Sequence, residues 1–470
     1  MECVSSAEDV VLRKRIIRLE EHGFRVAGRG RRSSPPGPLN PYSDITHIVV
    51  APRAISVGMR RDTLLLRRRH FDVPEGPERL AWQLVQGILR QPGGDQQWLR
   101  IQEVDRRLES PAPRVATTSV VAACIAVMIY QLLDPFASDV GAFVPELVAR
   151  GEWWRVASGN LVHSLALFPF HLLSNVILIL GFALLVERPL GPVRTLLVMA
   201  AAGVGAMGSS ALAGYEEVVG ASGIAAGLVG AELCLELRFA DRLPASWRLS
   251  RPLFITVLVL QVGFDLSIPF VAAAAHLGGF AAGFLATGLL APGAFGEKPA
   301  SPRLRWGAAA VVVAVGISLL GSLPLLLRDG DAMARHARSV LSIPERHAVR
   351  DNDLAWRMVT ESRLSPDQVA VAVRLAERAV DGTERSNPDV LDTLAEALFV
   401  LGDRSGALEI IDEAIALSED ESYFVEQRRR FNGERAEDDR PTPPFLPWGL
   451  RRTPPPEMEP EIEYRGGVEI

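Results

Sequence analysis

Seven stretches of this chain are apolar over the length that a helix needs to cross a lipid bilayer, and no other sequence feature constrains its fold as strongly. A spanning helix takes about 20 mainly apolar residues. So many stretches in one block exceed what the core of a water-soluble protein would bury. They are Val115–Leu133, His171–Val186, Thr195–Gly214, Val219–Leu237, Leu253–Val271, Ala272–Leu290 and Trp306–Leu327. We therefore predict an all-α polytopic membrane protein, with six transmembrane helices over residues 115–291 and a seventh over residues 305–327.

The charged residues lie mainly before and after this apolar block. The chain has 470 residues, of which 48% are hydrophobic and 23% charged. Residues 1–114 carry 20 Lys and Arg against 14 Asp and Glu, whereas residues 328–470 carry 19 against 30. The net charge of −6 therefore combines a basic N-terminal part with an acidic C-terminal part. The cysteines Cys3, Cys124 and Cys234 form no CxxC pair, so we expect neither a disulfide framework nor a metal site.

The Lys and Arg residues between the stretches predict the orientation of the chain, because cytoplasmic loops are enriched in them. One set of connections holds Arg106, Arg107, Arg114, Arg188, Arg194, Arg238, Arg242, Arg248, Arg251, Lys298, Arg303 and Arg305. The opposite set holds Asp134, Asp139, Glu146, Glu152, Glu216 and Glu217. We expect a multi-pass protein of the plasma membrane (the inner membrane of a bacterium), with a cytoplasmic N-terminus and residues 328–470 outside. The charged N-terminus lacks the apolar run of a cleavable signal peptide, so the first stretch is expected to direct insertion.

Strongly polar side chains lie near the start of three of the stretches, where they are costly and usually functional. His171 and Asn175 are one helical turn apart and share a face. Ser222 follows Gly220 and Ala221, and His276 precedes a pair of glycines. The three stretches run in the same direction across the membrane. These side chains are therefore expected at a similar depth, near the outer face.

The residue types at this depth are those of a serine nucleophile, its base and an oxyanion site. A Ser hydroxyl is a poor nucleophile unless a neighbouring base takes its proton, and His is the usual base. Ser222 and His276 fit these two roles. A tetrahedral intermediate also needs hydrogen-bond donors for its oxyanion. His171, Asn175 and the backbone N–H of Ser222 can supply them.

Small residues beside both reacting groups favour a close approach of the helices. Gly220 and Gly223 flank Ser222, and Gly278, Gly279 and Gly283 follow His276. A single Ser at a glycine-rich helix start is more often a cap or a packing residue, and a single His in a membrane helix is more often a packing residue. The combination of HxxxN, GxSG and AHxGG on three stretches of matching direction is far more specific.

Several motifs occur together in an order that is known from one protein family. They are Trp154-Arg155, His171 with Asn175, Gly181…Glu187…Gly191, Gly220-Ala221-Ser222-Gly223 and Ala275-His276-Leu277-Gly278-Gly279. On these motifs, residues 151–291 resemble the core of the rhomboid intramembrane serine proteases. This stretch is about a third of the chain.

The resemblance implies a fold, an activity and roles for individual residues. It implies a Ser222–His276 dyad without a third acidic member, with His171 and Asn175 as oxyanion partners and with no cofactor. Gly220, Gly223, Trp154 and Arg155 would support this site, and the substrates would be single-span membrane proteins cut near the outer face. Two features depart from the family pattern. An upstream His lies eight residues before His171, at His163, which indicates an insertion over Leu165–Pro169, and Ala226 stands where an aromatic residue is usual.

The first 112 residues predict a small cytoplasmic α+β domain of basic character. Ala7–Glu21 and Pro74–Arg90 are interpreted as helices, and Ile45–Val50 and Thr63–Phe71 as strands, with a loop over Gly28–Pro41. The basic run at residues 67–69 is more consistent with a strand end near anionic lipid than with nucleic-acid binding.

Residues 350–431 predict a helical domain that resembles a tetratricopeptide repeat. The matching residues are Leu391, Leu394, Ala395, Leu398, Gly402, Ala407, Ile411 and Ala414, and Ala372 with Ala379 indicates an earlier, degenerate copy. Such repeats usually bind a peptide or a partner protein, and a purely structural helical domain is the alternative. Residues 432–470, with Pro-rich and acidic runs, are interpreted as a disordered tail.

The sequence thus favours an intramembrane serine endopeptidase over two alternatives. A non-catalytic scaffold with a rhomboid-like fold would bind membrane spans and recruit partners through the helical repeat, but it need not keep both Ser222 and His276. A transporter would show broken helices with charged sites at mid-membrane and inverted repeats, and neither is evident.

Overall fold

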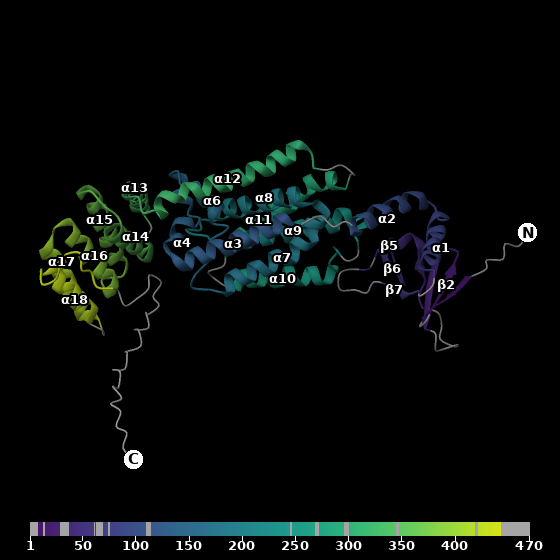
Figure 1. Ribbon diagram of the computed structural model, residues 1–470, viewed down its shortest axis with the longest axis horizontal. Helices are drawn as coiled ribbons and strands as arrows, with labels where there is room; N and C mark the ends of the chain where they lie inside the picture. The colour runs from purple at the N-terminus through teal and green to yellow at the C-terminus, as the bar shows by residue number, and fades with distance from the viewer. Residues whose placement is uncertain are drawn as a thin grey trace, which may run out of the picture.

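The structure is a computed structural model of the full chain. It describes residues 8–12, 15–28, 37–60, 62, 69–73, 76–109, 114–244, 247–267, 272–295, 300–344, 347–418 and 422–442. Three parts follow one another along the long axis (Figure 1): strands with two helices at one end, a bundle of long helices in the middle, and a group of shorter helices at the other end. The N-terminal and C-terminal parts therefore lie at opposite ends of the bundle. The predicted tail over residues 432–470 lies mostly outside the described residues.

The N-terminal part contains two antiparallel sheets and two helices. The first sheet has the order β1-β2-β3-β4 and the second the order β5-β6-β7. The strands are β1 (Glu8–Val11), β2 (Arg15–Glu20), β3 (Gly23–Gly28), β4 (Asn40–Pro41), β5 (Ile45–Ala51), β6 (Ala54–Met59) and β7 (Arg69–Asp72). The helices are η1 (Tyr42–Asp44), α1 (Pro77–Leu89) and α2 (Gly94–Glu109).

The helix predicted over Ala7–Glu21 is wrong, because this segment forms the antiparallel strands β1 and β2. Val10 pairs with Ile17, and Val11 with Ile16. On β2 the side chains of Ile17 and Leu19 are buried, two residues apart, as a strand requires and a helix does not. The β-branched Val and Ile residues of this segment favour the extended backbone.

Two of the other predictions for the N-terminal part are confirmed, and a third is described only at its end. β5 confirms the strand over Ile45–Val50, and α1 confirms the helix over Pro74–Arg90 within a few residues at its start. The predicted strand Thr63–Phe71 lies mostly outside the described residues, and β7 covers its end. Strand β6 and helix α2 were not predicted from the sequence.

The central bundle contains seven long helices and four short ones among the described residues. The long helices are α3 (Val115–Leu133), α7 (Phe170–Leu190), α8 (Pro192–Leu212), α9 (Ser222–Phe239), α10 (Arg251–Ser267), α11 (Ala273–Ala294) and α12 (Pro302–Leu326). The short helices are α4 (Phe136–Gly141), α5 (Pro145–Ala149), α6 (Arg155–Ser158) and η2 (Ala240–Arg242).

Five of the long helices have the length and hydropathy of a membrane span: α3, α7, α8, α11 and α12. The other two predicted spans do not meet this criterion. Helix α9 has 18 residues and includes Glu232, Glu236 and Arg238, while α10 has 17 residues and ends at Ser267. Both nevertheless belong to the bundle, since α9 packs against α7, α8 and α11, and α10 packs against α11.

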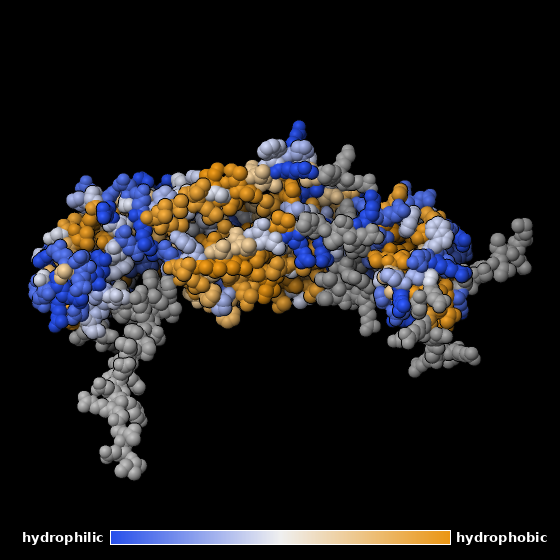
Figure 2. All heavy atoms as spheres, viewed as in Figure 1, coloured by the Kyte–Doolittle hydropathy of each residue, from blue (hydrophilic) through white to orange (hydrophobic). Residues whose placement is uncertain are grey.

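Apolar side chains cover much of the visible face of the bundle, as expected for helices that face lipid. The space-filling view shows a broad hydrophobic surface over the central part, between two mainly hydrophilic ends (Figure 2). Exposed apolar side chains on these helices include Ile129, Ile177, Leu260, Leu289 and Leu320. A continuous apolar surface of this size would be unfavourable in water. The chain is therefore an integral membrane protein with several membrane helices.

Glycines let α9 and α11 approach at backbone distance. A Cβ atom at Gly279 would lie 2.1 Å from the carbonyl oxygen of Gly223, and one at Gly283 would lie 2.1 Å from that of Gly227. A Cβ atom at Gly230 would lie 2.2 Å from the carbonyl oxygen of Phe280. Three successive contacts of this kind hold the two helices together over about two turns.

The C-terminal part contains six described helices that pack in sequence order. They are α13 (Gly330–Leu341), α14 (Ala348–Glu361), α15 (Pro366–Gly382), α16 (Pro388–Leu401), α17 (Arg404–Leu417) and α18 (Ser422–Phe431). Ala395, Ala407, Ile411 and Ala414 from the predicted repeat are buried. The assignment of these helices to the tetratricopeptide type stays a prediction.

The C-terminal helices dock on the loop that follows α3. Phe136, Val140, Val144 and Leu147 of this loop share one hydrophobic core with residues of α13–α18. Arg357 of α14 forms a buried ion pair with Asp134, at 2.7 Å. Glu152 of the loop binds His336 of α13. The interface is thus both apolar and charged.

The glycine contacts generate a prediction on stability. Gly283→Ala should lower the unfolding free energy by about 1–3 kcal/mol, the usual cost of overpacking a close contact. Thermal unfolding in detergent measures this. The matched control is Gly208→Ala on α8, where a Cβ atom meets nothing within 4 Å, so its stability should stay the same or rise. Equal effects of the two substitutions would contradict the close packing of α9 on α11.

Candidate functional site

Ser222 is the first residue of α9, and the loop before it is held by backbone hydrogen bonds. Val218 and Phe143 exchange N–H···O bonds of 2.9 and 3.0 Å. The N–H of Gly220 donates to the carbonyl oxygen of Gly159, at 2.9 Å. The segment that leads into Ser222 is therefore fixed to the loop that follows α3.

Gly220 brings this segment against His171 and Asn175 of α7. Its φ of +115° is a backbone conformation that favours glycine. A Cβ atom at this position would lie 2.7 Å from His171 Nε2 and 3.5 Å from Asn175 Nδ2. Gly220 is thus required by its backbone and by the space that the two side chains occupy. The structure brings both predicted oxyanion residues to the segment that precedes Ser222.

Asn175 carries a buried donor without a partner among the described residues. Its side chain is 3% exposed, and its Nδ2 atom makes no hydrogen bond. A buried unpaired donor costs about 1–3 kcal/mol. The group is therefore available for a ligand beside Gly220.

The contacts of His171 indicate which of its ring nitrogens carries the proton. The backbone N–H of Ser164 donates to His171 Nδ1, at 3.3 Å. Nδ1 is then the acceptor of the neutral ring, and Nε2 carries the hydrogen. This Nε2–H is the atom that lies closest to Gly220, so His171 presents a second donor to the same space.

His163 also lies at this site, although the sequence analysis gave it no role. Its Nδ1 donates to the carbonyl oxygen of Leu161, at 2.9 Å, and its Nε2 accepts a long hydrogen bond of 3.5 Å from the N–H of Ala221. Its ring lies edge-to-face with that of His171, with centroids 5.1 Å apart. Burial lowers the pKa of His163 to about 4, and the neighbouring His171 adds to the shift. The neutral ring can therefore hold the backbone next to Ser222.

His276 lies in the first turn of α11 and makes its contacts with α10. Its Nδ1 is 2.8 Å from Asp265 Oδ1 and 3.4 Å from Gln261 Nε2. No hydrogen bond joins Ser222 to His276 among the described residues. Their chain neighbours are close, since a Cβ atom at Gly223 would lie 3.6 Å from the carbonyl oxygen of Ala275. Catalytic hydrogen bonds are often long before substrate binds, so this geometry is compatible with a nucleophile and its base.

Trp154 and Arg155 form their hydrogen bonds within the loop after α3. The Arg155 side chain is fully buried and donates to the carbonyl oxygens of Asp139 and Ala142, at 2.6 and 2.7 Å. It also pairs with Glu152, at 2.7 Å. Trp154 Nε1 donates to the carbonyl oxygen of Val140, at 3.1 Å. This loop in turn anchors the segment before Ser222.

Neither Asp265 nor Gln261 was predicted at the site, and an acidic side chain beside His276 departs from the dyad without a third acidic member that the resemblance implies. The two residues are one helical turn apart within the apolar stretch Leu253–Val271. A carboxylate inside a membrane helix is itself a signal of function, and that signal was present in the sequence. What the sequence did not reveal is that α10 turns this carboxylate toward His276.

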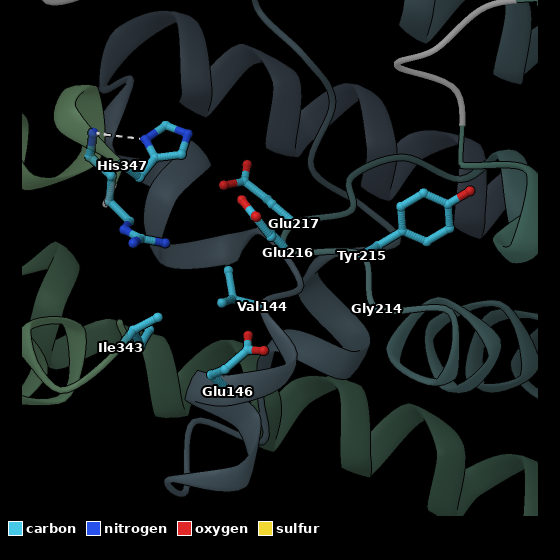
Figure 3. Close-up of a pocket in the computed structure, with 9 residues that line it drawn as sticks. Val144, Glu146, Gly214, Tyr215, Glu216, Glu217, Ile343 and His347 are labelled. Carbon is cyan, nitrogen blue, oxygen red and sulfur yellow. Dashed lines mark hydrogen bonds between the residues drawn. The ribbon is translucent and has the colours of Figure 1, made fainter. Parts of the chain in front are cut away.

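A separate cavity of about 440 Å³ is lined by residues of the loop after α3, of the segment between α8 and Ser222, and of the C-terminal part. Glu146, Glu216 and Glu217 line one side, and His347 and Arg350 line the other. The side chains of Glu216 and Glu217 extend toward the side of the cavity where His347 lies (Figure 3). Within the described ranges, no cluster of three His, Cys, Asp or Glu residues is arranged to hold a metal ion.

Comparisons with known proteins give a consistent family match for the central bundle. The family described as the rhomboid domain matches residues 150–293. The rhomboid protease GluP of Bacillus subtilis (strain 168) is 31% identical over 185 residues, which are 38% of this chain and 34% of that protein. RHOMBOID-like protein 4 of Arabidopsis thaliana is 34% identical over 151 residues, 31% of this chain and 36% of that protein.

A third relative is covered over more of its length. The YdcA protein of Bacillus subtilis (strain 168), whose name also places it with the rhomboid type, is 39% identical over 140 residues. These are 29% of this chain and 67% of that protein. The chain spans only about a third of the length of GluP and of RHOMBOID-like protein 4.

Proposed function

Because this chain belongs to the rhomboid family, we propose that it is an intramembrane serine endopeptidase with Ser222 as nucleophile and His276 as general base. Its substrates are transmembrane proteins, cut near the outer face of the membrane. The observation that carries the proposal is the convergence of Asn175 and His171 donors on the segment that leads into Ser222.

The reaction follows from the positions of these groups. Ser222 Oγ attacks the scissile carbonyl carbon while His276 Nε2 takes the hydroxyl proton, and His276 later returns the proton to the leaving amine. The carbonyl oxygen becomes an oxyanion, which accepts hydrogen bonds from Asn175 Nδ2, His171 Nε2–H and the N–H of Ser222. Water then hydrolyses the acyl-enzyme by the same route.

The chemistry restricts which substrates can react. Within a membrane helix each peptide carbonyl is already hydrogen-bonded inside the helix. A carbonyl reaches Ser222 only where the helix opens, so residues that weaken helices should lie near the cleavage site. Small side chains at that site would fit the crowded segment around Gly220. A single-span substrate that enters between the lipid-facing helices meets these conditions.

A non-catalytic scaffold with this fold is the second candidate. It would bind membrane spans in the same bundle and recruit a peptide or protein through α13–α18. The unpaired Asn175 donor argues against it, because a scaffold gains nothing from an unsatisfied buried amide.

Substitutions of the reacting groups test the proposal. Ser222→Ala should abolish cleavage of a single-span substrate in liposomes, and His276→Ala should do the same. The double variant should be no worse than either, because the two groups act as a unit. Asn175→Ala should retain residual activity and lose about 2.7–4 kcal/mol of transition-state stabilisation.

The assay needs a control for folding. Ser209→Ala on α8 removes a hydroxyl that bonds only to backbone carbonyls of Ala206 and Ala274 among the described residues, and it should leave turnover intact. Unchanged turnover by Ser222→Ala would refute the assignment.

The orientation proposed for the chain places α13–α18 outside the cytoplasm, on the side of Ser222. Its support is α12, the last helix of the bundle, which is apolar, long enough to cross and directly followed by α13. The basic residues Arg303 and Arg305 at its start favour a cytoplasmic end there. The helical domain would then lie where it can select the ectodomains of substrates.

Reporter fusions test this orientation. A reporter that is active only in the cytoplasm, fused after residue 340, should stay silent, and one fused after residue 110 should be active. Activity at both positions would mean that α12 does not cross, and that the helical domain cannot meet substrate ectodomains.

A further inference from the structure

Helix α10 has two polar side chains that face the bundle. Its exposed residues are mostly apolar and include Ile255, Val259, Leu260, Phe264 and Leu266. Its inward-facing side carries Gln261 and Asp265, which lie one turn apart. Both reach His276, and the Asp265 and His276 side chains are only 10% and 12% exposed.

A carboxylate inside the membrane is unfavourable unless it is paired and hydrogen-bonded. Asp265 meets both conditions. Its Oδ1 atom is 2.8 Å from His276 Nδ1 and accepts a hydrogen bond of 2.7 Å from Gln261 Nε2. Asp265 and Gln261 therefore contact the imidazole of His276, which the proposed reaction uses as its base.

We propose that Asp265 is a positioning residue that accepts the Nδ1–H of His276 and directs Nε2 toward Ser222. This inference rests on the proposed protease function. Because Nδ1 carries the hydrogen, the lone pair of Nε2 is free to take the Ser222 hydroxyl proton. The charged imidazolium that results is stabilised by the adjacent carboxylate, which keeps its own charge throughout. The proton leaves Nε2 for the amine, and Nδ1–H stays bonded to Asp265.

Gln261 has a secondary part in this arrangement. Its amide donates to the carboxylate oxygen that faces His276. This hydrogen bond orients the Asp265 carboxylate. It also offsets part of the free energy that the carboxylate loses when it is removed from water. His276, the proposed base, would therefore be held in place by side chains of α10. This helix contains none of the HxxxN, GxSG and AHxGG motifs.

Kinetics of position 265 variants, measured on the full chain in liposomes with a single-span substrate, test the inference. Asp265→Asn should lower kcat by about 10–100-fold, the range found for groups that orient a metal-binding His, and change KM less than twofold. Asp265→Glu should recover part of the lost kcat. Thr256→Ala, on the exposed face of the same helix, is the control and should match the wild type. Wild-type kcat in Asp265→Asn, or a higher one, would overturn the proposal.

Two further measurements distinguish a failure of this inference from a failure of the proposed protease function. Ser222→Ala decides the protease function itself: if it cleaves as fast as the wild type, the proposed function fails, whatever position 265 does. Nitrogen NMR of ¹⁵N-histidine-labelled protein, with His276→Ala for assignment, reports the ring directly. Hydrogen on Nδ1 of His276 in the wild type, and its loss or redistribution in Asp265→Asn, is expected. Hydrogen on Nε2 in the wild type would overturn the proposal even if the variants proved unstable.

Discussion

The close approach of α9 and α11 is the contact on which the candidate site depends. Ser222 and His276 are 54 positions apart in the chain, and each lies in the first turn of its helix. Gly223 against Gly279, and Gly227 against Gly283, leave no room for side chains between the two backbones. Any larger residue there would push the helices apart, and with them Ser222 and His276.

A second constraint fixes the height of Ser222 within the bundle. The segment before it is bonded to the loop after α3, and that loop is held internally by the buried Arg155 guanidinium. The same loop carries the docking site for the C-terminal helices, through Asp134 and Glu152. Burial raises the pKa of Asp139 well above its usual range, with the charges of Asp353 and Glu217 adding to the effect. The helical domain and the loop after α3 therefore share one charged, buried interface.

Much of this arrangement could be predicted from the sequence, because it depends on local signals. Apolar length marks the helices of the bundle, and polar residues at matching depth indicated which helices meet. The hairpin β1–β2 could not be told from a helix, since its short apolar run fits both periods until pairing decides between them. The contacts of His163 depend on the path of the Leu165–Pro169 segment, and the spacing between His163 and His171 does not predict that path. The pairing of Asp265 with His276 depends on the rotation of α10, and tertiary packing alone fixes that rotation.

The central claim is that His276 activates the Ser222 hydroxyl, and covalent labelling tests it most directly. A fluorophosphonate reacts readily with a serine whose proton is taken by a neighbouring base, and poorly with other serines. The account predicts that peptide mapping by mass spectrometry finds the adduct on Ser222 in membranes, and that His276→Ala abolishes it. An unlabelled Ser222 in protein that cleaves a substrate, or equal labelling of Ser222 in His276→Ala, would contradict the account.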